Sequence, residues 1–106
     1  MGFIDKLFGK KRDYAQEFKY AFLAAELSKC ADIITDWHKH TKNDANQDYA
    51  DAMMAAILAH QNKDKDLLDK AEFLYDHPDS KCENPALTDW FRTAAKMAMI
   101  KSKEDM

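Results

Sequence analysis

Glycine is confined to the start of the chain, and this distribution constrains the fold more than any other feature. The only two glycines among 106 residues are Gly2 and Gly9, and the only two prolines, Pro78 and Pro85, bracket one short segment. Glycine and proline are the residues that interrupt helices and mark turns most strongly. Since residues 10–77 contain neither, and nothing alternates with the two-residue period of a strand, the sequence predicts an all-α protein.

Four stretches carry apolar residues at the spacing of three and four that places side chains on one face of a helix. They cover residues 13–40, 45–61, 67–77 and 85–101. Asp44 followed by Gln47 resembles a capping box at the start of the second helix. Asn84 before Pro85 is typical of a helix start and predicts the beginning of the fourth. The alanines of the second helix predict that it is slim and lies centrally.

These helices predict a four-helix bundle-like domain with a short N-terminal amphipathic segment. We divide the chain into an N-terminal segment, a bundle and a frayed tail, over residues 1–12, 13–101 and 102–106. No apolar run reaches the roughly 18 residues that a membrane span requires. The start of the chain does not resemble a secretory signal, and two cysteines fit reduced thiols, so we expect a cytoplasmic protein.

The first predicted helix is apolar on two faces. The main stripe, expected in the core, contains Leu23, Leu27, Cys30, Ile34 and Trp37. A second stripe, displaced by about 140° at roughly 100° per residue, contains Tyr14, Phe18, Ala21, Phe22 and Ala25. Large apolar side chains outside a main stripe often mark partner surfaces.

We therefore predict a partner-binding surface formed by Tyr14, Phe18, Phe22 and Phe73, the last of which lies off the stripe of its own helix. Two alternatives remain for the second stripe. It packs against the N-terminal segment, or it packs against a second copy of the chain in a homo-oligomer. For Phe73 the alternative is an ordinary exposed aromatic residue.

The net charge of −3 hides an asymmetry between the start of the chain and its body. Residues 1–12 sum to +3, so the remaining 94 residues carry −6. An acidic body disfavours binding to a nucleic-acid backbone and favours a protein partner that is basic.

The N-terminal segment combines apolar and basic residues in a way that suits a membrane interface. Its apolar residues are Phe3, Ile4, Leu7 and Phe8, and its basic residues are Lys6, Lys10, Lys11 and Arg12. Such a peptide buries its apolar side chains among lipids while its cations meet anionic headgroups, although four apolar residues attach it only weakly. The alternative is that the segment folds back onto the bundle.

Asp32, Asp36 and His40 are spaced four residues apart, so they share a helix face and suggest a divalent-metal site. The alternative is a solvated polar face, with the histidine near the negative end of the helix dipole. The Glu-x-x-His pairs of di-iron bundles are absent from the chain. We therefore treat metal binding as the weakest alternative and expect no cofactor.

Catalytic patterns are missing from the chain. No serine lies between glycines as in a nucleophile elbow, and after Gly9 there is no glycine for a phosphate-binding loop. The sequence predicts a non-enzymatic interaction protein: an adaptor, an inhibitor or an immunity-type factor. The first alternative is a peripheral membrane protein attached by residues 1–12, and the second is a metal-binding helical protein.

Overall fold

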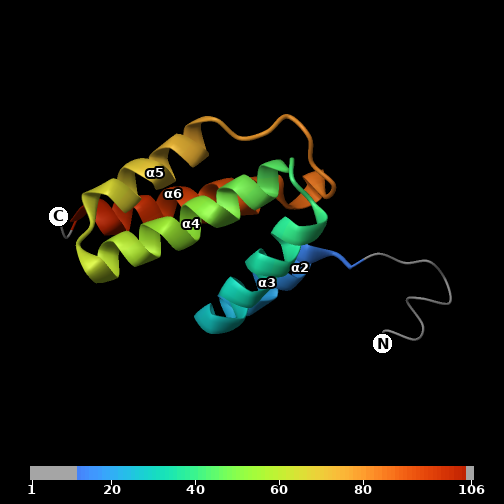
Figure 1. Cartoon of the computed structure of the whole chain (residues 1–106), viewed down its shortest axis with the longest axis horizontal. Coiled ribbons are helices and arrows are strands. Elements are labelled where there is room, and N and C mark those ends of the chain that lie inside the picture. The colour runs from blue at the N-terminus through green and yellow to red at the C-terminus, as the bar shows by residue number, and fades with distance from the viewer. Residues whose placement is uncertain (1–11, 105–106) are drawn as a thin grey trace, which may run out of the picture.

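The structure is a computed structural model that describes residues 12–104. These residues form five α-helices and one 3-10 turn, and they contain no strand, which confirms the all-α prediction. The elements are α2 (Tyr14–Leu23), α3 (Leu27–His40), α4 (Ala45–Asn62), α5 (Lys65–Asp76), η1 (Pro85–Leu87) and α6 (Thr88–Glu104). Figure 1 shows them as a bundle elongated along α4 and α6.

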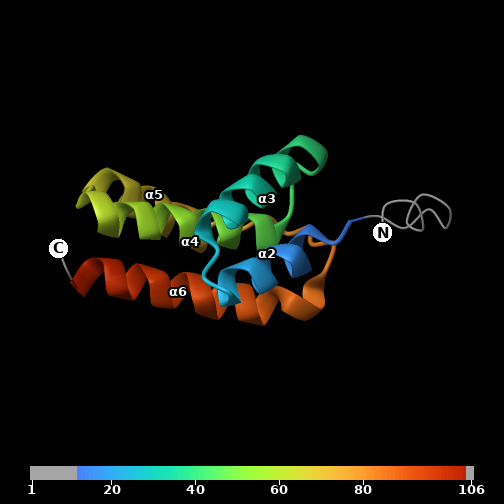
Figure 2. The ribbon, with the colours of Figure 1, turned by 90° about the horizontal axis from the view of Figure 1, so that it is seen from below.

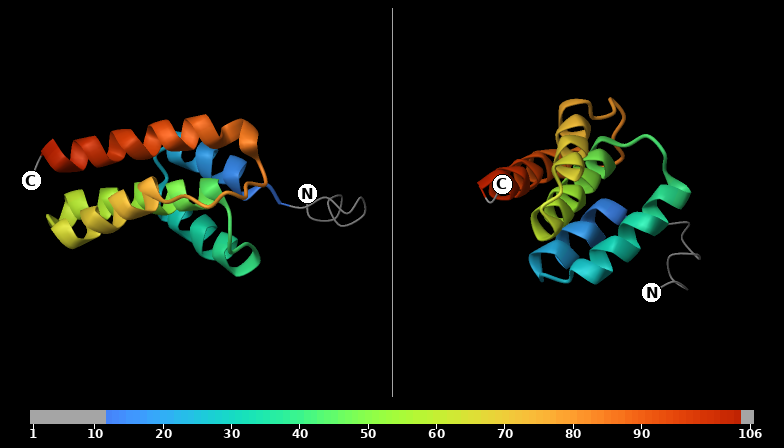
Figure 3. Two further views of the ribbon diagram at one scale, coloured as in Figure 1. Left: turned by 90° about the horizontal axis from the view of Figure 1, so that it is seen from above. Right: turned by 60° about the vertical axis from the view of Figure 1, so that its left-hand side comes forward.

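Helix α4 is the centre of the bundle, as its alanines predict. It packs lengthwise against α5 and against α6 (Figures 1 and 2). Ala50, Ala52, Ala56 and Ala59 are fully buried at these contacts. Because alanine has no side chain beyond Cβ, neighbouring helices approach closely on several sides of α4. The α2–α3 pair lies against the first half of α4 (Figure 3).

The predicted helix over residues 13–40 is wrong, because the chain turns between α2 and α3. Ala25 adopts the left-handed conformation, with φ of 59°. Its backbone N–H donates to Phe22 O at 2.9 Å, and Glu26 N–H donates to Ala21 O at 2.9 Å. These two bonds form the Schellman motif that ends many helices. Glycine normally occupies the left-handed position, so an alanine there leaves no sequence signal.

The turn changes which apolar stripe of α2 faces the core. Phe18 and Ala21, from the second stripe, are buried, whereas Leu23, from the predicted core stripe, is 62% exposed. In α3 the main stripe keeps its expected role at Cys30 and Trp37, which are buried. The two helices point in different directions, so one continuous stripe cannot face one core.

Helix starts follow the sequence signals in part. Asp44 Oδ1 accepts from Asn46 N–H at 2.8 Å and from Gln47 N–H at 3.3 Å, which confirms Asp44 as the N-cap of α4. The capping box is incomplete, because the Gln47 side chain donates instead to Thr41 O at 2.9 Å. Helix α5 begins at Lys65, two residues before the predicted start, with Asp64 as its cap.

The predicted start and end of the fourth helix both need correction. The side chain of Asn84 makes no capping bond, and Pro85 opens the 3-10 turn η1 instead of an α-helix. Helix α6 continues to Glu104, beyond the predicted end at residue 101. Ser102 is fully buried and Lys103 Nζ lies 3.2 Å from Glu72 Oε2, so residues 102–104 belong to the bundle and not to a frayed tail.

Candidate functional site

The predicted partner surface on α2 is wrong at Tyr14 and Phe18, because their side chains form part of the core. Phe18 is fully buried and stacks on Phe91 with ring centroids 5.7 Å apart. Tyr14 stacks on Trp37 at 6.2 Å, and the half-buried Phe22 meets the edge of Trp90 at 6.0 Å. Tyr14 and Phe18 are therefore covered within the chain, by α3 and by α6, whereas Phe22 stays half-buried.

Phe73 is exposed, and its role in partner binding stays a prediction. Its side chain is 62% exposed on α5 and stacks on His77, with ring centroids 4.5 Å apart. Since Asp69 and Asp76 lie four residues before it and three after it, they share its helix face. The carboxylates around this aromatic ring are consistent with the acidic character of the body.

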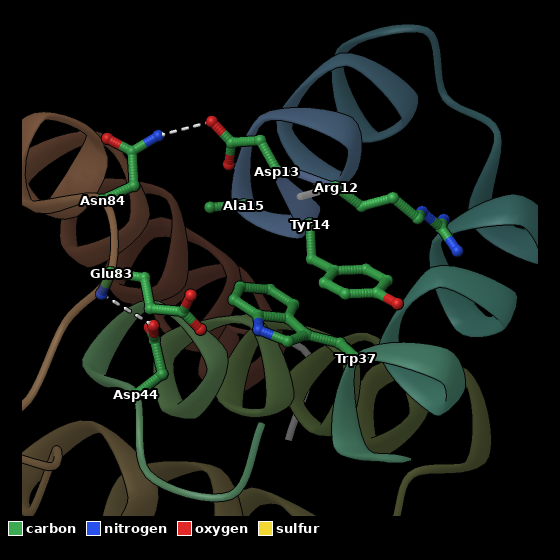
Figure 4. Close-up of a pocket in the computed structure, with 8 residues that line it drawn as sticks. All are labelled: Arg12, Asp13, Tyr14, Ala15, Trp37, Asp44, Glu83 and Asn84. Atoms are coloured by element: carbon green, nitrogen blue, oxygen red, sulfur yellow. Dashed lines mark hydrogen bonds between the residues drawn. The ribbon is translucent and has the colours of Figure 1, made fainter. Parts of the chain in front are cut away.

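A small polar pocket of about 160 Å³ opens where the start of α2 meets the loop between α5 and η1 (Figure 4). The rings of Tyr14 and Trp37 form one side, and Asp44 and Glu83 form the other. Asp44 Oδ2 accepts from Glu83 N–H at 3.0 Å, and the Asn84 side chain donates to Asp13 Oδ2 at 2.9 Å. These bonds attach the loop to α4 and to α2.

The carboxylates of this pocket are occupied by structural hydrogen bonds. Asp44 is 1% exposed and accepts from three backbone N–H groups. Asp13 Oδ1 accepts from Gln16 N–H at 3.1 Å, and Glu83 Oε1 accepts from the Thr41 hydroxyl at 3.0 Å. A general acid or base must be able to bond to a substrate, so this pocket is better suited to holding the loop than to catalysis.

The predicted metal ligands do not form a metal site. Asp36 Oδ1 lies 3.9 Å from His40 Nε2, as their spacing predicts, but Asp36 Oδ2 contacts Arg12 Nη1. Arg12 Nη2 also lies 2.6 Å from Glu17 Oε1. Asp32 is exposed, and within residues 12–104 no three His, Cys, Asp or Glu side chains are placed to hold a metal ion. The cation that pairs with the Asp36 carboxylate is thus the guanidinium group of Arg12.

Two partly buried carboxylates of α4 join segments that are far apart in sequence. Asp51 Oδ2 lies 2.8 Å from His38 Nε2, which links α4 to α3. Asp48 Oδ2 accepts from Asp79 N–H at 2.7 Å, which links α4 to the loop after α5. Burial raises the pKa of both carboxyl groups above the ordinary value. Sequence reasoning missed both links, because their partners lie 13 and 31 residues away.

An open apolar groove of about 650 Å³ runs beside α6; we call it the α6 groove. It is lined by Phe22, Leu23, Ile57, Trp90, Thr93, Ala94, Met97, Ala98, Ile100, Lys101 and Glu104. Three large side chains on it are strongly exposed: Leu23 by 62%, Met97 by 65% and Ile100 by 48%. Met97 is therefore a large apolar side chain of α6 that the core does not cover.

The groove exists because α2 is shorter than the helices beside it. Figure 2 shows α2 alongside only the first half of α6, while α4 and α6 continue past its end at Leu23. Phe22 therefore closes one end of the groove, and Ile57 of α4 lines it from the side opposite α6. The turn at residues 24–26, which sequence reasoning missed, leaves this part of α4 and α6 uncovered.

One lysine lines the α6 groove, and two more belong to the helices that form it. Lys101 lines it, Lys96 is exposed next to Met97, and Lys19 Nζ lies 5.6 Å from the centre of the Trp90 ring. Within residues 12–104, no carboxylate lies at ion-pair distance from any of these three ammonium groups. The groove thus combines an apolar lining with nearby positive charge that no carboxylate of residues 12–104 pairs.

The predicted membrane-contact residues lie mainly outside the described residues. This holds for Phe3, Ile4, Leu7, Phe8, Lys6, Lys10 and Lys11. Arg12 is described, and it pairs with Glu17 and Asp36 as stated above. Among the helices of residues 12–104, none is both long enough and apolar enough to span a membrane.

Comparison of this chain with protein-family models, with curated proteins and with solved structures finds no match.

Proposed function

We propose that this chain is a non-enzymatic interaction protein that binds a helix of a protein partner in the α6 groove. The observation that carries the proposal is the exposure of Leu23, Met97 and Ile100 along one open apolar groove. Large exposed apolar patches with polar rims are typical of interaction surfaces. Amphipathic helices bind such grooves by inserting apolar side chains spaced three and four residues apart.

Helix α2 already packs on α4 and α6 in the way proposed for the partner helix. Helix α2 packs against α4 and α6 and inserts Phe18 against Phe91 and Phe22 against Trp90. The α6 groove continues from the end of α2 along the same two helices. A partner helix in line with α2 would meet surfaces of the same kind, which supports a helix as the bound element.

Site-specific photocross-linking tests this function. We would place p-benzoylphenylalanine at Met97 or, as the matched control, at Lys39 on the exposed surface of α3, in cells that make the protein. We expect a protein adduct from position 97 that is absent from position 39. Adding Ile100→Asp, which puts a charge in the groove, should remove the adduct. Equal adducts at both positions, or none at position 97, would contradict the proposal.

A further inference from the structure

We infer that the segment bound in the α6 groove is an acidic amphipathic helix, with apolar side chains on one face and carboxylates beside them. This inference rests on the proposed function and specifies the chemistry of the partner. It differs from the expectation of a basic partner, which came from the negative charge of the body outside residues 1–12. The charged side chains near the groove are mainly lysines, so the local charge is positive, opposite to that of the acidic body.

Helix α6 is basic on its exposed side. It contains Arg92, Lys96, Lys101 and Lys103 against Asp89 and Glu104. Arg92 Nη1 lies 3.0 Å from Asp89 Oδ1, and Lys103 is paired with Glu72. Lys96 and Lys101 therefore remain without a carboxylate among residues 12–104, and Lys19 of α2 adds a third cation. Glu104 is the one carboxylate that lines the groove.

The rest of the body is acidic. Residues 13–87 contain fifteen Asp and Glu against eight Lys. An acidic partner is repelled by most of this surface and attracted to the lysines at the groove. Such an arrangement orients the encounter and selects against partners of the wrong charge.

The shape of the groove favours a helix over a flat membrane surface. Its free length runs along α6 from Thr93 to Glu104, twelve residues or about 18 Å at 1.5 Å per residue. A partner helix of about three turns matches this length. A bilayer would touch the exposed Met97 and Ile100, whereas a helix can also contact the half-buried Ile57 that lines the groove.

The chain's own residues 1–11 fit the groove less well. They carry Lys6, Lys10 and Lys11 against Asp5, so their charge has the same sign as the lysines around the groove. The observations therefore favour a separate acidic helix.

Two designed peptides test the inference on the full-length protein. Both are fluorescein-labelled amphipathic helices of fourteen residues with the same leucine face; one carries Glu at the remaining positions and the other carries Lys. Fluorescence anisotropy at low salt measures the dissociation constants. We expect the Glu peptide to bind at least about tenfold more tightly, and added salt to weaken its binding.

Charge-reversal variants test whether the lysines near the groove cause the preference for the Glu peptide. The triple change Lys19→Glu, Lys96→Glu and Lys101→Glu should abolish the preference for the Glu peptide. The matched control reverses three exposed lysines elsewhere, Lys29→Glu, Lys39→Glu and Lys42→Glu, and should keep the preference. A preference that survives the first triple change would overturn the inference.

Other outcomes separate the inference from the proposed function. If both peptides bind equally and Met97→Asp abolishes binding, the acidic partner is wrong but the helix groove stands. If neither peptide binds, both proposals fail. Met97-dependent binding to phosphatidylglycerol vesicles in place of the peptides would identify a membrane surface. A dimer by light scattering that Met97→Asp dissociates would identify a second copy, and either result overturns the acidic helix.

Discussion

A single buried carboxylate, Asp44, joins three segments of the chain. Its Oδ1 caps α4, and its Oδ2 accepts from Glu83 N–H in the loop that leads to α6. Asp64 caps α5 in the same way, its Oδ1 accepting from Asp66 and Leu67 N–H, but its carboxylate accepts no third hydrogen bond from residues 12–104. Comparing the two aspartates thus separates the contribution of a helix cap to stability from the contribution of a tertiary hydrogen bond.

We predict that Asp44→Ala lowers the free energy of unfolding by about 2 to 4 kcal/mol, because it removes a cap and leaves Glu83 N–H without its acceptor. Asp64→Ala removes a cap alone and should cost about 1 kcal/mol. Urea denaturation of both variants measures the two values. Equal losses would show that the bond to Glu83 contributes nothing.

Asp48 makes stability depend on pH. Burial raises the pKa of its carboxyl group above the ordinary value of 3.8, so the folded chain keeps this proton at pH values where the unfolded chain has lost it. The contribution of Asp48 to stability therefore falls as the pH rises from the ordinary pKa through the raised one.

We predict that Asp48→Asn, which keeps an oxygen acceptor for Asp79 N–H, gains stability relative to the unmodified protein as the pH rises from the ordinary pKa of 3.8 through the raised pKa of Asp48. Urea denaturation at several pH values, with the difference between the two proteins plotted against pH, is the measurement. If the stability of Asp48→Asn minus that of the unmodified protein stays constant or falls as the pH rises, the pKa of Asp48 is not raised.

At the scale of elements, the turn between α2 and α3 determines both the core and the groove. It depends on Ala25 in the left-handed conformation, which costs a residue with a Cβ about 1 to 2 kcal/mol. The Schellman bonds and the packing of Phe18 and Trp37 offset this cost. A glycine at residue 25 would have marked the turn in the sequence.

We predict that Ala25→Gly raises the free energy of unfolding by about 0.5 to 1 kcal/mol, because glycine adopts positive φ without the steric cost. Ala24, with φ of −85°, has the negative φ that alanine adopts without steric cost, and it supplies the control. Ala24→Gly should lower stability by about 0.5 kcal/mol. Thermal or urea unfolding distinguishes the variants, and a loss of stability at both positions would contradict the assignment of the turn.

At the scale of the whole molecule, the core is assembled from aromatic side chains of helices that are distant in sequence. Phe18 of α2 stacks on Phe91 of α6, and Trp37 of α3 meets the edge of the same ring at 6.2 Å. These contacts hold the α2–α3 pair onto the α4–α6 pair. Phe73, by contrast, contacts a residue of its own helix end and lies outside this core.

We predict that Phe18→Ala lowers the free energy of unfolding by about 3 to 5 kcal/mol, because it leaves a cavity between α2 and α6. Phe73→Ala, the exposed control, should cost about 1 kcal/mol or less. Chemical denaturation of both variants is the measurement. Similar values for the two would contradict the burial of Phe18 in the core.

The sequence by itself determined the helical class, the central place of α4 and the cap at Asp44, because spacing, alanine content and capping act within a few residues. Tertiary contacts decided the rest. The turn at Ala25 follows no local signal, Asn84 bonds to Asp13 instead of capping its helix, and the exposure of Met97 depends on where α2 ends. Each of these outcomes depends on residues far apart in the chain, and a pattern along one helix does not contain them.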